Sequence, residues 1–248
     1  MSATTEPVIV LDDVHKAFGP KQVLRGVSFE VHEGKTVGIM GGSGTGKSVA
    51  LRHIIGLMHQ DSGRVLVSGH DMQTIKPHDL FALRKRMGYV FQEGALINWM
   101  SICDNVALPL RENTDLAESE IQDRVREKLE LVDVLDAAQK IPAEISGGMK
   151  KRVGIARALI TDPEILLYDE PNAGLDPKMS RQVNEHIRRV SDLGVTALVV
   201  EHRIACMRSV ADEVIFLNGG RVHVRAGVDE FFASEDPLLR DFLGDDKD

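Results

Sequence analysis

Residues 37–48 read VGIMGGSGTGKS, and this stretch decides the fold. A short β-branched and apolar run, Val37–Met40, leads into a glycine-rich loop, after which Val49–Leu57 carries apolar residues at helical spacing. The loop fits the pattern G-x-x-x-x-G-K-[ST], with the strand before it and the helix after it that the pattern requires. It predicts a P-loop rather than a glycine-rich turn with an exposed lysine. The residues expected to surround bound phosphates are Gly41, Gly42, Ser43, Gly44, Thr45, Gly46, Lys47 and Ser48.

Each residue type in this loop has a physical role in holding phosphate. Glycines allow the backbone to turn its N–H groups toward an anion, and the helix N-terminus adds positive potential. Lys47 is expected to reach the β and γ phosphates of a nucleotide, and Ser48 to ligate Mg²⁺. The sequence therefore predicts a nucleoside triphosphate site at the end of this strand.

A second group of polar residues follows another buried strand. Asp169 and Glu170 come directly after the apolar run Ile165–Tyr168, and α/β sheets place ligands at the carboxyl ends of their strands. Asp169 is expected to hold Mg²⁺ through water, whereas Glu170 is expected to orient and polarise an attacking water. Alone, such a pair is more often a turn or a helix cap. Beside a P-loop, the catalytic interpretation is favoured.

A third segment combines a serine, two glycines and the start of a helix. Ser146, Gly147 and Gly148 precede the basic, helix-compatible run Lys150–Arg157. A helix N-terminus with these residues can bind an anion. By itself the segment would be interpreted as a capped helix.

Composition limits the classes of protein to consider. The chain has 248 residues and a formal net charge of −8, which disfavours a general nucleic-acid binder. Cys103 and Cys206 lie far apart, and the start of the chain carries no secretory signal, so we expect free thiols in a reducing cytosol. A spanning helix needs about 20 mostly apolar residues. The sequence has no such run, so any membrane role is expected to come through a partner subunit.

The remaining pattern predicts an α/β core with a helical insert. Val8–Leu11 and Val23–Val31 are expected to be strands, and residues 96–160 are expected to be mostly helical. A helix near Met179–Val190 then precedes the buried strand Ala197–Val200. We find no internal repeat or linker.

In order and spacing, the three motifs together resemble those of ATP-binding cassette (ABC) ATPases, and the segment at Ser146–Gly148 resembles their signature. Phe18 matches the aromatic residue that stacks on adenine, and Gln92 matches the Q-loop glutamine. Ala173–Asp176 matches the D-loop, and His202 matches the switch histidine. The resemblance covers residues 8–243.

This resemblance implies an α/β P-loop NTPase fold in one cassette, residues 1–248, with a RecA-like core and an N-terminal antiparallel β subdomain. The nucleotide-binding core would comprise residues 1–91 and 160–230, the helical subdomain residues 92–159, and a C-terminal tail residues 231–248. It implies ATP and Mg²⁺ as cofactors. The implied catalytic residues are Glu170, His202 and Gln92. The implied residues at the metal are Ser48, Gln92 and Asp169.

The resemblance also implies a head-to-tail homodimer around two ATP molecules. In the family, the signature of one subunit closes over the P-loop of another, so Ser146, Gly147 and Gly148 would act in trans, with Asp176 near the interface. ATP hydrolysis would open the dimer and drive a membrane permease.

Within the family, the closest resemblance is to the Mla and Mce type of lipid-transport ATPases. It rests on Phe91–Leu96, on Asp104–Glu112, and on Met149, where most cassettes carry glutamine. It implies integral membrane permease subunits, a lipid-carrying periplasmic MCE-type subunit, a small accessory protein, and a peripheral location on the cytoplasmic face of the inner membrane. The alternatives are the ATPase of a small-solute importer of the amino acid type, a cytosolic non-transport ABC ATPase, and a P-loop small-molecule kinase.

Three positions depart from the family pattern. Phe18 replaces the commoner tyrosine, Ile145 the commoner leucine, and Glu201 the small polar residue that usually precedes the switch histidine. A carboxylate at Glu201 is expected to raise the pKa of His202 or to restrict its reach.

Two apolar groups allow two interpretations each. The first group would form the core of the insert or contact the permease, and it comprises Leu96, Ile97, Trp99 and Met100. The second predicts an amphipathic helix before the acidic end Asp245–Asp248. It would pack on its own domain, or clasp the opposite subunit or an accessory protein, and it comprises Phe231, Phe232, Leu238, Leu239, Phe242 and Leu243.

Overall fold

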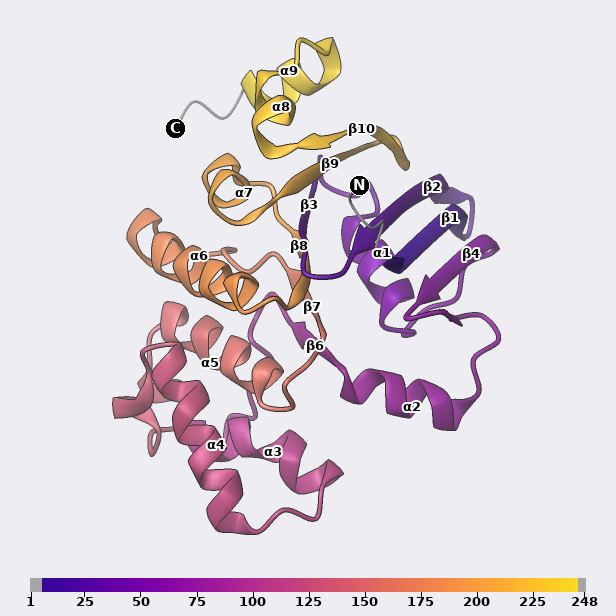
Figure 1. The fold of residues 1–248 in the computed structure, drawn as a ribbon. Coiled ribbons are helices and arrows are strands. Elements are labelled where there is room, and N and C mark those ends of the chain that lie inside the picture. The colour runs from indigo at the N-terminus through magenta and orange to yellow at the C-terminus, as the bar shows by residue number, and fades with distance from the viewer. Residues whose placement is uncertain (1–5, 245–248) are drawn as a thin grey trace, which may run out of the picture.

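Two β-sheets organise the fold in the computed structural model, which describes residues 6–244 (Figure 1). The strands are β1 (Pro7–Phe18), β2 (Lys21–His32), β3 (Thr36–Met40), β4 (Ser62–Val67), β5 (His70–Asp71), β6 (Met87–Val90), β7 (Ile165–Asp169), β8 (Thr196–Val200), β9 (Glu213–Asn218) and β10 (Arg221–Gly227). The helices are α1 (Lys47–Ile54), α2 (Pro77–Lys85), α3 (Ile102–Asn113), α4 (Glu118–Leu131), α5 (Gly147–Leu159), α6 (Pro177–Asp192), α7 (Ile204–Val210), α8 (Val228–Ala233) and α9 (Pro237–Gly244), with the short 3-10 helices η1 (Leu135–Ala137) and η2 (Pro142–Glu144).

The larger sheet has the strand order β10-β9-β3-β8-β7-β6. Its strands from β9 to β6 are parallel, and β10 pairs antiparallel with β9. β8 lies between β3 and β7, so that Val200 is in register with Ile39 on one side and with Asp169 on the other. The P-loop, the carboxylates after β7 and the histidine after β8 therefore leave the same edge of the sheet.

The smaller sheet is antiparallel, with the order β2-β1-β4-β5. Figure 1 shows α1 between the two sheets, and residues of all three form one buried cluster. Along β7, Ile165 and Leu167 pack into this cluster, whereas Leu166 and Tyr168 pack into the core on the opposite face. Burial on both faces explains why the sequence of this strand is continuously apolar.

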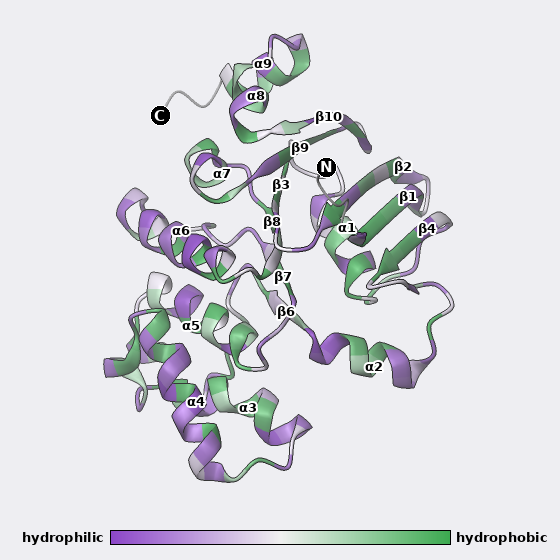
Figure 2. Ribbon diagram, viewed as in Figure 1, coloured by the Kyte–Doolittle hydropathy of each residue, from purple (hydrophilic) through white to green (hydrophobic). Residues whose placement is uncertain are grey.

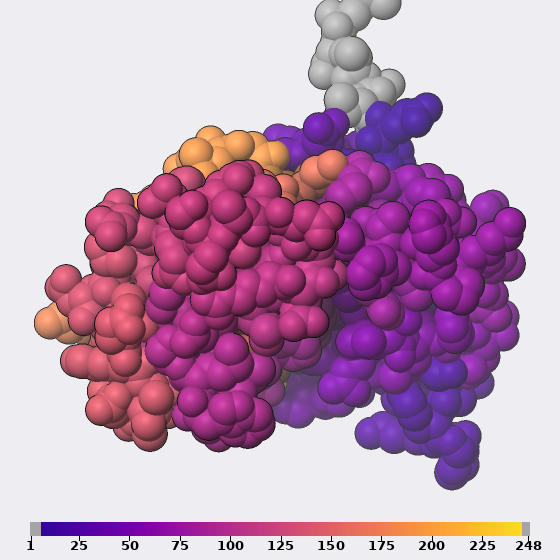
Figure 3. Space-filling model, turned by 90° about the horizontal axis from the view of Figure 1, so that it is seen from below, coloured from indigo at the N-terminus to yellow at the C-terminus, as the bar shows by residue number. Residues whose placement is uncertain are grey.

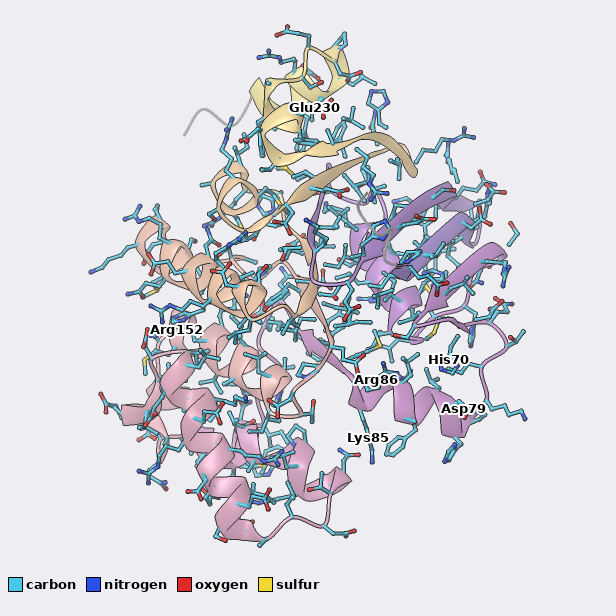
Figure 4. The ribbon with its side chains drawn as sticks, viewed as in Figure 1. His70, Asp79, Lys85, Arg86, Arg152 and Glu230 are labelled. Atoms are coloured by element: carbon cyan, nitrogen blue, oxygen red, sulfur yellow. The ribbon has the colours of Figure 1, made fainter. Side chains whose placement is uncertain are left out.

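Helices α3, α4 and α5 share the core of that opposite face. One buried cluster joins residues from these helices to the sheet, among them Val106, Val125, Val153 and Tyr168. Arg152 donates to the carbonyl oxygens of Val132 and Asp133, at 2.9 and 2.8 Å, and so links α5 to the end of α4 (Figure 4). Seen from below, the helices form one side of the molecule beside the N-terminal half (Figure 3). The predicted α/β core with an antiparallel β part and a helical segment is confirmed.

Figure 2 shows hydrophobic residues along the central strands and many hydrophilic ones along α4 and α6. Among the large apolar side chains, Trp99 is 85% exposed, and Phe91 and Phe81 are also exposed. Within residues 6–244, no helix has both the length and the apolar character that crossing a membrane requires.

Helix α1 is shorter than predicted, because it ends at Ile54 rather than at Leu57. Gly56 has a φ of 72°, and its N–H donates to the carbonyl oxygen of His53 at 3.0 Å. The N–H of Leu57 donates to the carbonyl oxygen of Arg52 at 2.8 Å. These two bonds form a Schellman motif, which ends the helix although the apolar spacing continues.

The C-terminal helices α8 and α9 pack on their own chain. Phe231 and Leu239 are fully buried, and the ring of Phe242 lies 5.0 Å from that of Phe216 in β9. Leu238 is exposed, whereas the half-buried residues that join the same core are Phe232, Phe242 and Leu243. Of the two interpretations of this apolar face, the structure supports packing on its own domain. The predicted acidic end, residues 245–248, lies outside the described residues.

Replacing Phe231 with alanine is expected to destabilise the isolated chain by about 3–5 kcal/mol, the usual cost of truncating a buried phenylalanine. Urea unfolding of the purified chain measures the effect. Leu238→Ala is the matched control, because that side chain is 49% exposed, and it should change stability by about 0.5 kcal/mol or less. If both variants lowered the free energy of unfolding by the same small amount, burial of Phe231 would not stabilise the chain.

Candidate nucleotide site

The P-loop connects β3 to α1 in a conformation that its glycines permit. Gly41 and Gly46 have φ values of 151° and 105°, a region that favours glycine. A Cβ atom on Gly41 would lie 2.3 Å from the carbonyl oxygen of Leu217, and one on Gly46 would lie 2.4 Å from Cδ2 of Leu24. In the described structure no side chain caps α1. The N–H groups of its first turn are therefore available to an anion such as phosphate.

Lys47 lies inside this loop and is buried. Its Nζ donates to the carbonyl oxygens of Gly41 at 2.7 Å and Gly42 at 3.0 Å. Burial lowers the pKa of Lys47. The negative charges that oppose this shift belong to Glu170, Glu201 and Asp169. A desolvated ammonium group held by carbonyl oxygens fits a strongly charged ligand, which the phosphates of ATP provide.

Ser48 and Asp169 form a pair of oxygen ligands at the end of β7. Ser48 Oγ donates to Asp169 Oδ1 at 2.7 Å, and the hydroxyl of Tyr89 donates to Asp169 Oδ2 at 2.9 Å. Mg²⁺ prefers hydroxyl and carboxylate oxygens, so these residues fit the predicted ion. Burial, together with the charge of Asp169, raises the pKa of Tyr89 and keeps its hydroxyl a donor. Tyr89 was not predicted, and its one signal is its place in the strand before Gln92.

Glu170 leaves β7 in an unusual backbone conformation. Its φ is 49°, a region that non-glycine residues rarely adopt, and its N–H donates to the carbonyl oxygen of Val200 at 2.9 Å. The side chain is half-buried, and its charge acts on Lys47. The bond to β8 thus holds a strained residue where the sequence predicts the catalytic carboxylate.

The Q-loop is fixed by α5. The carbonyl oxygen of Gln92 accepts a bond from Nζ of Lys151, while the Gln92 residue itself is exposed. Arg157 donates to the carbonyl oxygens of Gly94 and Ala95, both at 2.8 Å. Burial lowers the pKa of Lys151. The sequence analysis did not predict that Lys151 and Arg157 hold the Q-loop. Their signal in the sequence was the basic run Lys150–Arg157, which lies within α5.

His202 and Phe18 are both accessible to a ligand. His202 lines a pocket of about 460 Å³ together with Gly42 and Thr45 of the P-loop. Its side chain is 51% exposed, and its Nδ1 lies 3.3 Å from Oε1 of Glu201. Phe18, at the end of β1, is 46% exposed. The structure therefore brings His202 to the P-loop and leaves a ring surface of Phe18 open for stacking.

The signature segment lines a different pocket. Oγ of Ser146 accepts a bond from the N–H of Met149 at 3.2 Å and so caps α5. Gly147 lines a pocket of about 250 Å³ with Gln92 and with Gly174 of the D-loop. Asp176 caps α6. The pocket of Gly147 and the pocket of the P-loop have no lining residue in common.

Three features together define an ATP-binding cassette ATPase. A P-loop lies at the centre of a sheet of mostly parallel strands, paired carboxylates follow a strand two positions away, and a helical segment contains a helix with a glycine-rich start. The chain belongs to the ABC transporter family, whose family model matches residues 24–173. The resemblance stated from the motifs is confirmed.

Relatives in this family carry different names. The probable ribonucleotide transport ATP-binding protein mkl of Mycobacterium leprae is 39% identical over 92% of this chain and 66% of its own length. The methionine import ATP-binding protein MetN of Rhizobium johnstonii is 40% identical over 94% of this chain and 64% of its own length. The chloroplastic protein TRIGALACTOSYLDIACYLGLYCEROL 3 of Arabidopsis thaliana is 37% identical over 96% of this chain and 74% of its own length. This chain thus spans slightly less than two thirds of the length of mkl and of MetN.

Solved cassettes have the same fold. The dimeric structure of MJ0796, a bacterial ABC transporter cassette, has a TM-score of 0.82 and 31% identity over 89% of this chain and 98% of its own. The same cassette in a dimeric post-hydrolysis state is bound to ADP and Pi, with a TM-score of 0.81. The protein cbiO1 of Clostridium perfringens, part of the transporter complex cbiONQ, has a TM-score of 0.84 and 28% identity over 96% of this chain and 94% of its own.

Proposed function

We propose that this chain is the ATP-hydrolysing motor subunit of an ABC transporter. The observation that carries the proposal is the division of one set of ATPase groups between two pockets. The P-loop and His202 line one pocket, and Gly147 of the signature lines the other, with Gln92. Mg²⁺ held by Ser48, Asp169 and Gln92 would neutralise charge on the phosphates. Glu170 would take the proton of the attacking water.

The separate signature pocket supports a head-to-tail dimer. A chain whose signature and P-loop line separate pockets has an incomplete site. A second copy related by a two-fold axis completes both sites at once. In this arrangement Ser146, Gly147 and Gly148 donate to the γ-phosphate of the partner's nucleotide, and loss of that phosphate on hydrolysis opens the dimer.

Replacing Ser146 with arginine is expected to lower ATP turnover by about 10²-fold or more, because the substitution puts a bulky cation where donors must face the γ-phosphate. Nucleotide binding should equal that of the wild type, because each P-loop is intact. Ser101→Arg is the control: Ser101 caps α3 as Ser146 caps α5, so this variant loses a helix cap outside the signature. Loss of ATP binding in Ser146→Arg alone would contradict action in trans.

The exposed surface beside the Q-loop is the proposed contact with the permease. Trp99 is 85% exposed, whereas Leu96, Ile97 and Met100 are half-buried in the helical segment. Large exposed aromatic residues are typical of protein interfaces. We place this face against permease subunits at the cytoplasmic side of the inner membrane. No nucleic acid takes part in the proposed function.

Lipid, and phospholipid in particular, is the proposed cargo. The motif resemblance at Phe91–Leu96, Asp104–Glu112 and Met149 supports it, and one relative is named for trigalactosyldiacylglycerol, a glycolipid. The proposed complex includes a lipid-carrying MCE-type subunit and a small accessory protein. The second candidate, an amino acid importer, is favoured by the 40% identity to a methionine import protein.

Reconstitution of the complex with its co-purifying permease distinguishes these two candidates. We expect phospholipid transfer between vesicles to require ATP and Glu170, and lipid to change the ATPase rate. Stimulation by an amino acid binding protein, with no response to lipid, would favour the importer instead.

A further inference from the structure

Glu201 links the switch loop after β8 to the segment after β7. It is fully buried. Its Oε2 accepts a bond from the N–H of Asn172 at 3.2 Å, and its Oε1 accepts bonds from the N–H groups of His202 at 2.8 Å and Arg203 at 3.3 Å. A carboxylate removed from water and held by backbone donors fixes the two loops relative to each other.

Arg203 provides a second link between the same loops. Its Nη2 donates to the carbonyl oxygen of Leu175 at 2.9 Å, and its Nη1 donates to Oγ of Ser180 at 2.5 Å. Leu175 belongs to the D-loop and directly precedes Asp176, which caps α6. The bonded residues Asn172 and Leu175 lie on either side of Gly174 in the D-loop segment. Glu201 and Arg203 are the two chain neighbours of His202.

An open space lies beside these polar contacts. A pocket of about 390 Å³ lies between the D-loop and the start of α7, and the residues lining it include Asn172, Leu175, Arg203 and Cys206. Leu175 and Cys206 belong to the same buried core, and the hydrogen bonds of Glu201 and Arg203 add directional links between the loops at the edge of this space. Oε1 of Glu201 also lies 3.3 Å from Nδ1 of His202, so the same carboxylate adjoins the imidazole ring.

We propose that Glu201 and Arg203 are positioning residues that couple the D-loop to His202. Movement of the D-loop when a second subunit docks is then passed to the switch histidine, which reaches the γ-phosphate only with the D-loop seated. This inference rests on the proposed function, because it requires an ATP-dependent dimer. Neither residue needs to contact nucleotide for this role.

Kinetics of two variants test the coupling. In Glu201→Gln and Arg203→Ala we expect kcat for ATP to fall by about 10-fold or more, with KM and the Kd for ATP within about 2-fold, because the P-loop is unchanged. The double variant should be no slower than the slower single variant, since both changes break one coupling. Arg188→Ala is the matched control. It removes an α6 arginine that pairs with Asp192 and Asp212, and it should leave both constants unchanged.

Thiol labelling gives a readout that does not depend on catalysis. Cys206 lines the pocket and is 1% exposed, whereas Cys103 is buried in the helical segment. We expect alkylation of Cys206, followed by peptide mass mapping, to become at least several-fold faster in both variants, with Cys103 as the unchanged internal reference. If Glu201→Gln does not fold, Arg203→Ala carries the test.

The outcomes separate the inference from the function on which it rests. A wild type that binds but never hydrolyses ATP, alone or with its permease, would overturn the proposed function. An active wild type whose Glu201 and Arg203 variants keep their kcat, or lose kcat and ATP affinity together, would overturn the coupling alone. Labelling of Cys206 that is as slow in both variants as in the wild type would overturn it as well.

Discussion

Lys47→Ala is expected to lower the affinity for ATP by about 10- to 100-fold and to reduce turnover to background. The reason is that Nζ of Lys47 is held inside the P-loop by two carbonyl oxygens, where a phosphate would replace them as its partner. Hydrogen bonds to charged groups contribute about 1.5–3 kcal/mol each, and 1.4 kcal/mol is about tenfold in affinity. Titration with a fluorescent ATP analogue measures the loss.

Lys35→Ala is the matched control for this variant. Lys35 is exposed and directly precedes β3, at the opposite end of the strand from the P-loop. The Lys35→Ala substitution removes one positive charge from the chain, as Lys47→Ala does, but leaves the P-loop unchanged. If Lys47→Ala bound ATP as tightly as Lys35→Ala does, the loop would not be the nucleotide site.

Glu170→Gln is expected to separate binding from hydrolysis. The amide keeps the size of the side chain but cannot take a proton from water, and loss of a general base costs about 10²–10⁴-fold in rate. Affinity for ATP should remain near the wild-type value, because the P-loop and Asp169 are unchanged. Single-turnover hydrolysis and equilibrium binding measure the two quantities separately.

Glu164→Gln is the control, because Glu164 lies just before β7, the strand that Glu170 follows. Glu164 is a surface residue paired with Arg86, and such exposed pairs contribute about 0–1 kcal/mol. Its turnover should match the wild type. A Glu170→Gln variant with more than about a tenth of the wild-type rate would contradict the role of Glu170 as base.

The sequence predicted best where the determinants of structure are local. The P-loop, the strand Ile165–Tyr168 and the capped helix after Ser146 each depend on a few consecutive residues, and the structure has all of them. The end of α1 is also local, but Gly56 was missed because the apolar spacing continues to Leu57.

Contacts between distant segments could not be predicted. Tyr89 and Asp169 are 80 positions apart, and only the neighbouring positions of β6 and β7 in the sheet bring them together. Glu201 was recognised as a departure from the family pattern, yet its bond to Asn172 depends on how the segment after β7 turns. The side on which the tail packs also depended on the complete core, since its apolar face alone fits either interpretation.

The mass of Glu170→Gln in solution tests the central claim, that two chains share two ATP molecules, most directly. With hydrolysis blocked, light scattering behind a sizing column should show twice the chain mass of 27.3 kDa in ATP and Mg²⁺, and the single-chain mass in ADP. Adding Ser146→Arg to this variant should restore the single-chain mass while ATP stays bound. A single-chain mass for Glu170→Gln itself at saturating ATP would contradict the head-to-tail dimer of the isolated subunit.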